Sequence, residues 1–198
     1  MSSNIFSSEA RNELEWMNEP EHWAFTERGE LHVEAPAAAD FFKDPAQKHM
    51  VSSAPFLFKQ IEASCELTVQ LQVDMHHIYD SGCLMLMADD NNWAKLCYEF
   101  NGEYPTIVSV VTKDGSSDDC NSMRVTTPSP FLRITKLGKV VSFYYSENGE
   151  RWTLVRYFGV DEARSYVAGV VAQSPQGRGC RVVFQSLSIT NPEAGSRF

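Results

Sequence analysis

Hydrophobic and polar residues alternate along much of this chain, which is the period of a β-strand with one buried face. The alternation is clearest over residues 61–73, where every odd position is apolar and every even position is polar. We therefore predict one long, half-buried strand there. Residues 14–33 repeat the pattern in shorter pieces around Arg28-Gly29 and predict an opening pair of short strands.

Residues 80–112 predict three further strands in direct succession. The breaks between them are an Asp/Asn-rich turn at residues 89–92 and an Asn101-Gly102 turn, and tight turns favour both residue types. This stretch is therefore an antiparallel meander. An even-numbered second loop places Thr106, Val108 and Val110 beside Glu99, whereas an odd-numbered loop places Ile107, Ser109 and Val111 there, and the sequence leaves this choice open.

The remainder of the chain predicts a further strand and two hairpins. Residues 131–136 form the strand, residues 139–145 pair with 152–158, and residues 166–173 pair with 181–190. Residues 35–55 and 114–122 are predicted to be loops, because the first has three prolines and the second is rich in Gly, Ser and Asp. About a dozen strands with no helix beyond one turn near Ser8 predict an all-β, two-sheet antiparallel β-sandwich.

Length and composition limit the classes of protein and partner. The 198 residues predict a single domain, 1–198, with its core at about residues 14–190. The net charge of -9 argues against nucleic-acid and membrane partners, which require clustered Lys and Arg. Five cysteines without paired spacing, and a beginning that lacks the pattern of a secretory signal, predict reduced thiols and a cytoplasmic location.

Several short motifs occur in an order that resembles a known family. They are residues 16–20 (WMNEP), 40–42 (DFF), 79–85 (YDSGCLM), 93–99 (WAKLCYE), 109–112 (SVVT), 146–152 (SENGERW) and 173–175 (QSP). The order resembles the concanavalin A-like family called domain of unknown function 1349. That family includes bacterial proteins of carbohydrate metabolism and the fungal regulator of enolase, and similar modules are appended to some glycoside hydrolases. The resemblance implies a jelly-roll sandwich with a concave face, and it supplies no catalytic residue.

The middle strand of the meander carries the charged residues of the predicted site. Lys95 and Glu99 share one face of this strand and span roughly 13 Å, which is too far for direct contact but suits the two ends of a small sugar. The resemblance to the concanavalin A-like family implies a small sugar or oligosaccharide as the ligand, bound on the concave face. The predicted ligand-binding residues are His49, Tyr79, Trp93, Lys95, Glu99, Ser109 and Gln173. Tyr79 and Trp93 are expected to be exposed stacking platforms, and the other five to form hydrogen bonds.

Two other functions stay open at this point. A glycoside-processing enzyme needs a second carboxyl group within about 10 Å of Glu99, and the positions two residues away are Cys97 and Asn101. No catalytic residue is therefore assigned. A protein-interaction module that regulates a metabolic enzyme would instead present a flat apolar patch, and a homodimer formed through sheet edges is also compatible with a sandwich.

No metal or cofactor is expected. Asp89-Asp-Asn-Asn92 and the segment from Asp114 to Asp119 are rich in oxygen atoms, which calcium prefers as ligands. However, Asp, Asn and Ser side chains also bond their own backbone in turns, and neither segment matches a helix-loop-helix calcium loop. The adjacent pair His76-His77 is interpreted as part of a polar turn.

Overall fold

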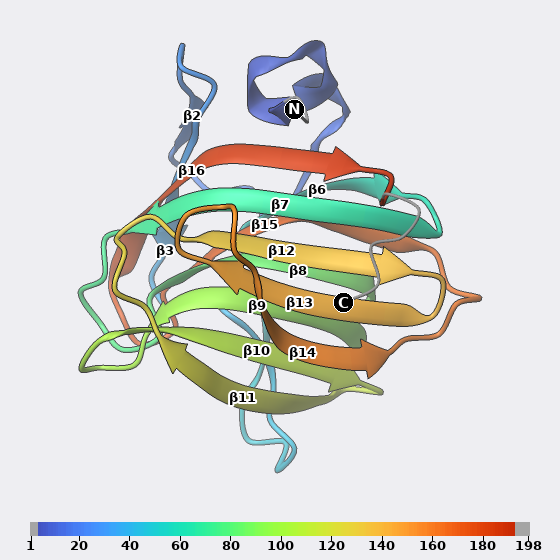
Figure 1. Ribbon diagram of the computed structural model, residues 1–198. Coiled ribbons are helices and arrows are strands. Elements are labelled where there is room, and N and C mark those ends of the chain that lie inside the picture. The colour runs from blue at the N-terminus through green and yellow to red at the C-terminus, as the bar shows by residue number, and fades with distance from the viewer. Residues whose placement is uncertain (1–3, 193–198) are drawn as a thin grey trace.

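Two antiparallel sheets of seven strands face each other in the computed structural model, which describes residues 4–192 (Figure 1). The first sheet has the order β1 (Glu15–Met17), β6 (Phe56–Ile61), β15 (Tyr166–Gln173), β8 (Ser81–Asp89), β9 (Asn92–Phe100), β10 (Pro105–Lys113) and β11 (Ser116–Arg124). The second has the order β14 (Thr153–Gly159), β13 (Val140–Ser146), β12 (Phe131–Leu137), β7 (Ser64–Val73), β16 (Gly179–Thr190), β3 (Leu31–Pro36) and β2 (Trp23–Phe25). The predicted β-sandwich is thereby confirmed.

The main core lies between the two sheets. Strand β7 contributes Leu67, Val69 and Leu71, which have no exposed surface, and β9 contributes Leu96 from the opposite sheet. Burying one such side chain contributes about 1.5–3 kcal/mol, so a few dozen of them supply the driving force for stacking the sheets. Two short 3-10 helices, Ile5–Ser7 and Glu9–Glu13, lie on either side of Ser8, where one helical turn was expected.

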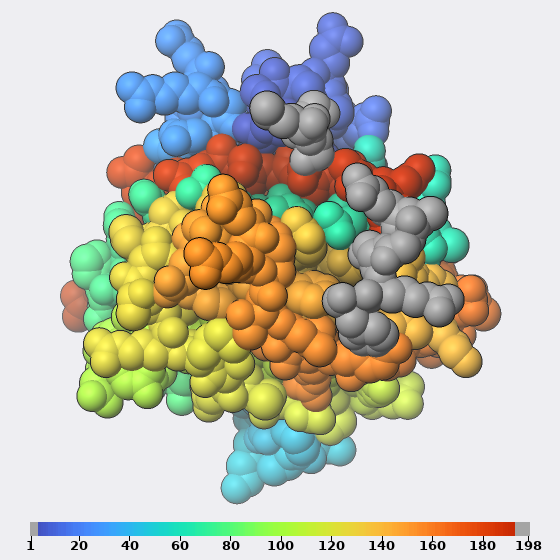
Figure 2. All heavy atoms as spheres, in the orientation of Figure 1, coloured from blue at the N-terminus to red at the C-terminus, as the bar shows by residue number. Residues whose placement is uncertain are grey.

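A second apolar cluster covers the outer face of the first sheet. Residues 35–55 were predicted to be a loop, but they contain the hairpin of β4 (Phe41–Lys43) and β5 (Met50–Ser52), part of which projects beyond the sheets (Figures 1 and 2). Phe41 from this hairpin is fully buried against Trp93 of β9. Strands β8 and β9 are therefore buried on both faces, which explains the continuous apolar run of β8 and the burial of Lys95 and Glu99 on β9.

Three other sequence predictions are wrong in detail. The chain crosses between the sheets at Glu62 and Ala63, so residues 61–73 are not one strand. Residues 116–124 form the edge strand β11 rather than a loop, and their polar character suits a sheet edge exposed to water. Strands β15 and β16 belong to different sheets and do not form a hairpin.

The meander and one hairpin agree with prediction. Strands β8, β9 and β10 pair in succession, and β13 pairs with β14. Phe100 pairs with Pro105, so the loop between β9 and β10 has an even number of residues. Thr106, Val108 and Val110 consequently lie on the same face as Glu99, Cys97 and Lys95. Within residues 4–192, no helix has the length and apolar character needed to cross a membrane.

Candidate functional site

A cavity of about 200 Å³ opens on the outer face of the first sheet, beside the β4–β5 hairpin. Its walls come from β9, β10 and β11, from the end of β15 and from the neighbouring loops. The lining residues are Asp40, Phe42, His49, Tyr79, Lys95, Glu99, Val108, Val110, Asp119, Gln173, Pro175 and Gln176. Five of the seven predicted ligand-binding residues therefore meet in one groove. They are His49, Tyr79, Lys95, Glu99 and Gln173.

The period of the strands explains this convergence. Residues two apart on β9 point to the same face, so Lys95 and Glu99 both face outward. Val110 pairs with Lys95 on one side and with Asp119 on the other. The floor of the groove is therefore an apolar strip of β10, Val108 and Val110, bordered by charged residues of β9 and β11.

Lys95 is the buried centre of the polar contacts. Its side chain is almost fully buried, and Nζ donates to the Phe41 carbonyl oxygen at 2.7 Å, to Gln173 Oε1 at 2.9 Å and to Asp40 Oδ1 at 3.4 Å. Burial lowers the pKa of Lys95, but the Asp40 carboxylate together with Cys97, Cys83 and Glu99 outweighs burial and holds this pKa above its usual range. Lys95 is therefore an ammonium ion that fixes the positions of the β4 backbone and Gln173.

Glu99 is the second charged residue of β9 in the groove. Glu99 is 8% exposed. Burial raises the pKa of its carboxyl well above the usual range, although the nearby Lys95 ammonium opposes this change. No group within residues 4–192 donates a hydrogen bond to this side chain. Burial also raises the pKa of Asp119. The groove thus holds two carboxyl groups that retain a proton more readily than exposed ones.

Tyr79 and His49 lie at the rim. Tyr79 is 43% exposed and has a positive φ of 73°, which is rare for a residue with a side chain. The fully buried Asp80 supports this turn by accepting hydrogen bonds from the His76 and His77 amides and from Ser174 Oγ. His49 Nε2 lies 3.6 Å from Asp40 Oδ2. Tyr79 is therefore exposed, as predicted, and is held by the turn that precedes β8.

Two predicted site residues lie outside the groove. Trp93 is 3% exposed because its ring packs against Phe41 and its indole N–H donates to the Asp90 carbonyl, so the prediction of an exposed platform is wrong for this residue. Ser109 points to the opposite face of β10, where Arg156 Nη1 contacts its hydroxyl at 3.4 Å. The even loop between β9 and β10 accounts for this orientation.

Sequence reasoning missed several groove residues. Asp119 was assigned to a loop, and a uniformly polar edge strand has no alternation that would have revealed it. Asp40 belongs to the motif of residues 40–42, but only the fold brings it to Lys95. Val108 and Val110 required the loop parity between β9 and β10, which is visible only in the register.

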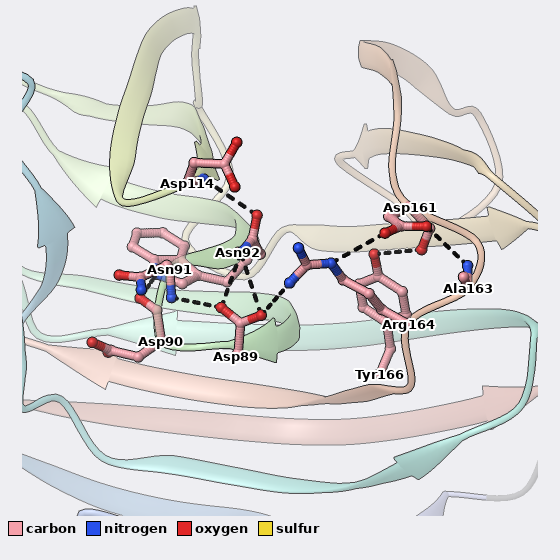
Figure 3. A network of polar contacts seen from close by, with 10 residues as sticks. Asp89, Asp90, Asn91, Asn92, Asp114, Asp161, Ala163, Arg164 and Tyr166 are labelled. Atoms are coloured by element: carbon pink, nitrogen blue, oxygen red, sulfur yellow. Dashed lines mark hydrogen bonds and ion pairs between the residues drawn. The ribbon is translucent and has the colours of Figure 1, made fainter.

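A larger cavity of about 350 Å³ lies between the sheets, and two of its charged lining residues, Asp161 and Arg164, pair with each other. Arg164 bonds to Asp89 and to Asp161, as Figure 3 shows. Asp89 also accepts hydrogen bonds from the Asn91 amide at 2.9 Å and from Asn92 Nδ2 at 3.0 Å. The Asp89 carboxylate, one of the groups considered as a calcium ligand, therefore accepts hydrogen bonds from the protein itself. In the described residues no group of three or more His, Cys, Asp or Glu has the arrangement of a metal site.

Relatives of known structure share the fold. A protein of Saccharomyces cerevisiae described as functionally unknown is 25% identical, with a TM-score of 0.86 over 93% of this chain and 99% of its own. The GH43 protein BlXynB of Bacillus licheniformis is 16% identical, with a TM-score of 0.77 over 96% of this chain but only 39% of its own. A legume lectin-like domain of Entamoeba histolytica is 11% identical, with a TM-score of 0.62 over 92% of this chain and 91% of its own. These similarities confirm the concanavalin A-like sandwich.

Sequence comparison identifies the family. The chain is 27% identical to Regulation of enolase protein 1 of Saccharomyces cerevisiae over 178 residues, which cover 89% of both proteins. The family model described as "Protein of unknown function (DUF1349)" matches residues 16–192, which include the whole groove. The resemblance seen in the order of the motifs is thereby confirmed, and the chain belongs to the DUF1349 family.

Proposed function

We propose that the groove beside the β4–β5 hairpin binds a small neutral sugar or the end of a neutral oligosaccharide. The observation that carries this proposal is the combination of an apolar floor, Val108 and Val110, with carboxyl groups of Glu99 and Asp119 on either side. A pyranose ring has an apolar face and a rim of hydroxyl groups, and these surfaces match that arrangement. The exposed ring of Tyr79 adds a stacking surface at the rim.

The polar groups divide into those that contact the ligand and those that hold the site. An ammonium group has three hydrogen-bond donors, and Lys95 Nζ already contacts three protein acceptors. Lys95 therefore positions Gln173 and Asp40. Glu99 accepts no hydrogen bond from the described protein, so its carboxyl is the group best placed to accept one from a sugar hydroxyl.

The charge of the groove argues for a neutral ligand. Asp40, Glu99 and Asp119 line it together with Lys95, and Lys95 is paired with Asp40. Of these four residues, the two that remain outside the ion pair, Glu99 and Asp119, both carry carboxyl groups. A uronic acid or a sugar phosphate would bring a negative charge beside two carboxyl groups whose own ionisation burial already disfavours, which is unfavourable in a partly buried site. The similarities to a GH43 protein and to a lectin-like domain support the fold on which this proposal depends.

Binding of a panel of neutral sugars and oligosaccharides tests the proposal, by glycan array and then by calorimetry. We expect Glu99→Ala, Asp119→Ala and Tyr79→Ala each to weaken binding about tenfold, since one lost hydrogen bond or stacking contact contributes about 1.4 kcal/mol. Tyr157→Ala is the matched control, because Tyr157 is an exposed tyrosine of the other sheet. Absence of binding to every neutral sugar, or equal affinity of all three groove variants and the parent, would exclude the groove as proposed.

A glycoside-processing activity is the second candidate. It is favoured by one observation: Glu99 and Asp119 line one groove and both have raised pKa values, as a catalytic acid requires. Release of the aryl group from chromogenic glycosides measures this activity. Glu99→Gln must abolish the release, and turnover that survives this substitution would assign the activity to a contaminant.

A further inference from the structure

Two buried cysteines face each other beneath the groove. Cys83 of β8 and Cys97 of β9 are directly opposite in the antiparallel ladder, and both are free thiols without exposed surface. They belong to the apolar cluster between the first sheet and the segment that contains the β4–β5 hairpin. The proposed ligand site makes no use of either thiol.

The hydrogen bonds of the ladder show which kind of pair they form. Phe100 N donates to the Asp80 carbonyl oxygen at 3.0 Å, so these two residues are at a hydrogen-bonded position. Hydrogen-bonded and non-hydrogen-bonded positions alternate along an antiparallel pair. Cys97 and Cys83 lie three positions further along, so they form a non-hydrogen-bonded pair. In such pairs the Cα atoms are about 4.5 Å apart, which is within the range that a disulfide spans.

The surroundings of the two thiols favour thiolate chemistry at Cys83. Burial raises the pKa of Cys83, but its contacts with Cys97, the Lys95 ammonium and Ser81 together outweigh burial, so that this pKa is lowered. The pKa of Cys97 is raised by burial and by Cys83. Lys95 and Glu99, the residues two positions before and after Cys97 on the same strand face, line the groove, as does Val108 opposite Cys97, so the pair lies directly beside the groove.

We propose that Cys83 and Cys97 are a site of reversible oxidation, at which a peroxide converts the two thiols into a cross-strand disulfide. The Cys83 thiolate attacks one peroxide oxygen, the O–O bond breaks, and a sulfenic acid and one water form. The Cys97 sulfur then attacks the Cys83 sulfur and displaces the hydroxyl group as a second water. The thiols lose two electrons and two protons, and the hydrogen peroxide gains them as it becomes two waters. A disulfide whose geometry departs from the relaxed one is more reducible than a relaxed disulfide, so reduction by thiols can restore the pair.

The experiment uses Cys120→Ser as the parent, because Cys120 is the exposed cysteine among the five and would cross-link molecules. This folded variant is treated with hydrogen peroxide, and its intact mass and non-reducing peptide map are measured. We expect the loss of two hydrogen atoms, one linked peptide pair that joins Cys83 to Cys97, and full reversal by dithiothreitol. Circular dichroism during the reaction must show the folded spectrum.

Two further variants keep the result interpretable. In the same background, Cys83→Ser and Cys97→Ser must both fail to lose hydrogen, and Cys97→Ser must accumulate a sulfenic acid that dimedone traps. Cys65 and Cys180 are buried elsewhere in the sandwich and must stay reduced. Four free thiols after treatment of the folded parent, or a disulfide that involves Cys65 or Cys180, would overturn the proposal. The readout is a mass, so the result does not depend on the ligand of the groove.

Discussion

Lys95 Nζ lies 2.9 Å from Gln173 Oε1, although the two residues are 78 positions apart in the sequence. Lys95 is on β9 and Gln173 ends β15, and β8 runs between these two strands. The lysine side chain therefore reaches over a neighbouring strand, and it also contacts Asp40 and the Phe41 backbone of the covering segment. One ammonium group joins the sheet, the end of β15 and the β4–β5 hairpin.

Lys95→Met should strongly destabilise the fold. It leaves the Asp40 carboxylate, the Phe41 carbonyl and the Gln173 amide without their common donor, and breaking a buried ion pair costs about 3–5 kcal/mol. Urea unfolding gives the free energy of unfolding. Lys59→Met is the control, because Lys59 pairs with the exposed Glu13 and should change this free energy much less. Equal losses in the two variants would contradict a central role for Lys95.

Glu99→Gln should increase stability, and increasingly so at higher pH. Burial raises the pKa of Glu99 in the folded protein, so the folded state binds its proton more tightly than the unfolded state. The free energy of unfolding therefore falls as pH rises from the unfolded pKa, about 4.3, toward the folded pKa. The loss is about 1.4 kcal/mol for each unit by which the folded pKa is raised. Glutamine does not titrate and removes this loss.

Urea unfolding of the parent and of Glu99→Gln measures this effect. The pH is varied from about 4, near the pKa of an unperturbed glutamate, to about 8. The difference in unfolding free energy should be small at the acidic end and widen toward the neutral end. Asp119 titrates in both proteins and cancels in the comparison to first order. A difference that stays constant across this range would show that Glu99 is ionised as easily in the folded protein as in the unfolded one.

Asp80→Ala should destabilise the turn that carries Tyr79. The fully buried Asp80 accepts hydrogen bonds from two backbone amides and from Ser174 Oγ, and charge-assisted bonds of this kind are worth about 1.5–3 kcal/mol each. We expect a loss of about 3–5 kcal/mol in urea unfolding, because the three donors do not contribute independently. Ser174→Ala removes a single donor and should lose about 1 kcal/mol. A loss in Asp80→Ala no larger than in Ser174→Ala would contradict this prediction.

The meander shows how far sequence patterns reach. Alternation and turn residues located β8, β9 and β10 within a few residues, because local periodicity reflects which face of each strand is buried. The β4–β5 hairpin was missed because its prolines and mixed polarity are typical of a loop, and its burial depends on a distant sheet face. The crossing at Glu62-Ala63 was missed because the alternation continues through the point where the chain changes sheets.

The position of a groove residue was predictable where the orientation of its side chain depends only on the period of its own strand. Lys95 and Glu99 share a face by the period of two, and this was sufficient to place both in the groove. Ser109 depended on loop parity, which local sequence did not decide, and it lies on the other face of β10. Trp93 has the expected orientation, but the covering Phe41 removes it from solvent, and such a long-range contact leaves no mark in a strand pattern.

Addition of millimolar calcium, or of EDTA, should leave the melting temperature of this protein unchanged. The Asp89 carboxylate bonds to Asn92 Nδ2, to the Asn91 amide and to Arg164, and these contacts lower its pKa. A calcium ion bound there would have to displace the Arg164 guanidinium and break the turn. Thermal melts with calcium, magnesium or EDTA measure the effect. A rise in melting temperature that is specific to calcium and is lost in Asp89→Asn would show that the turn at residues 89–92 is a calcium site after all.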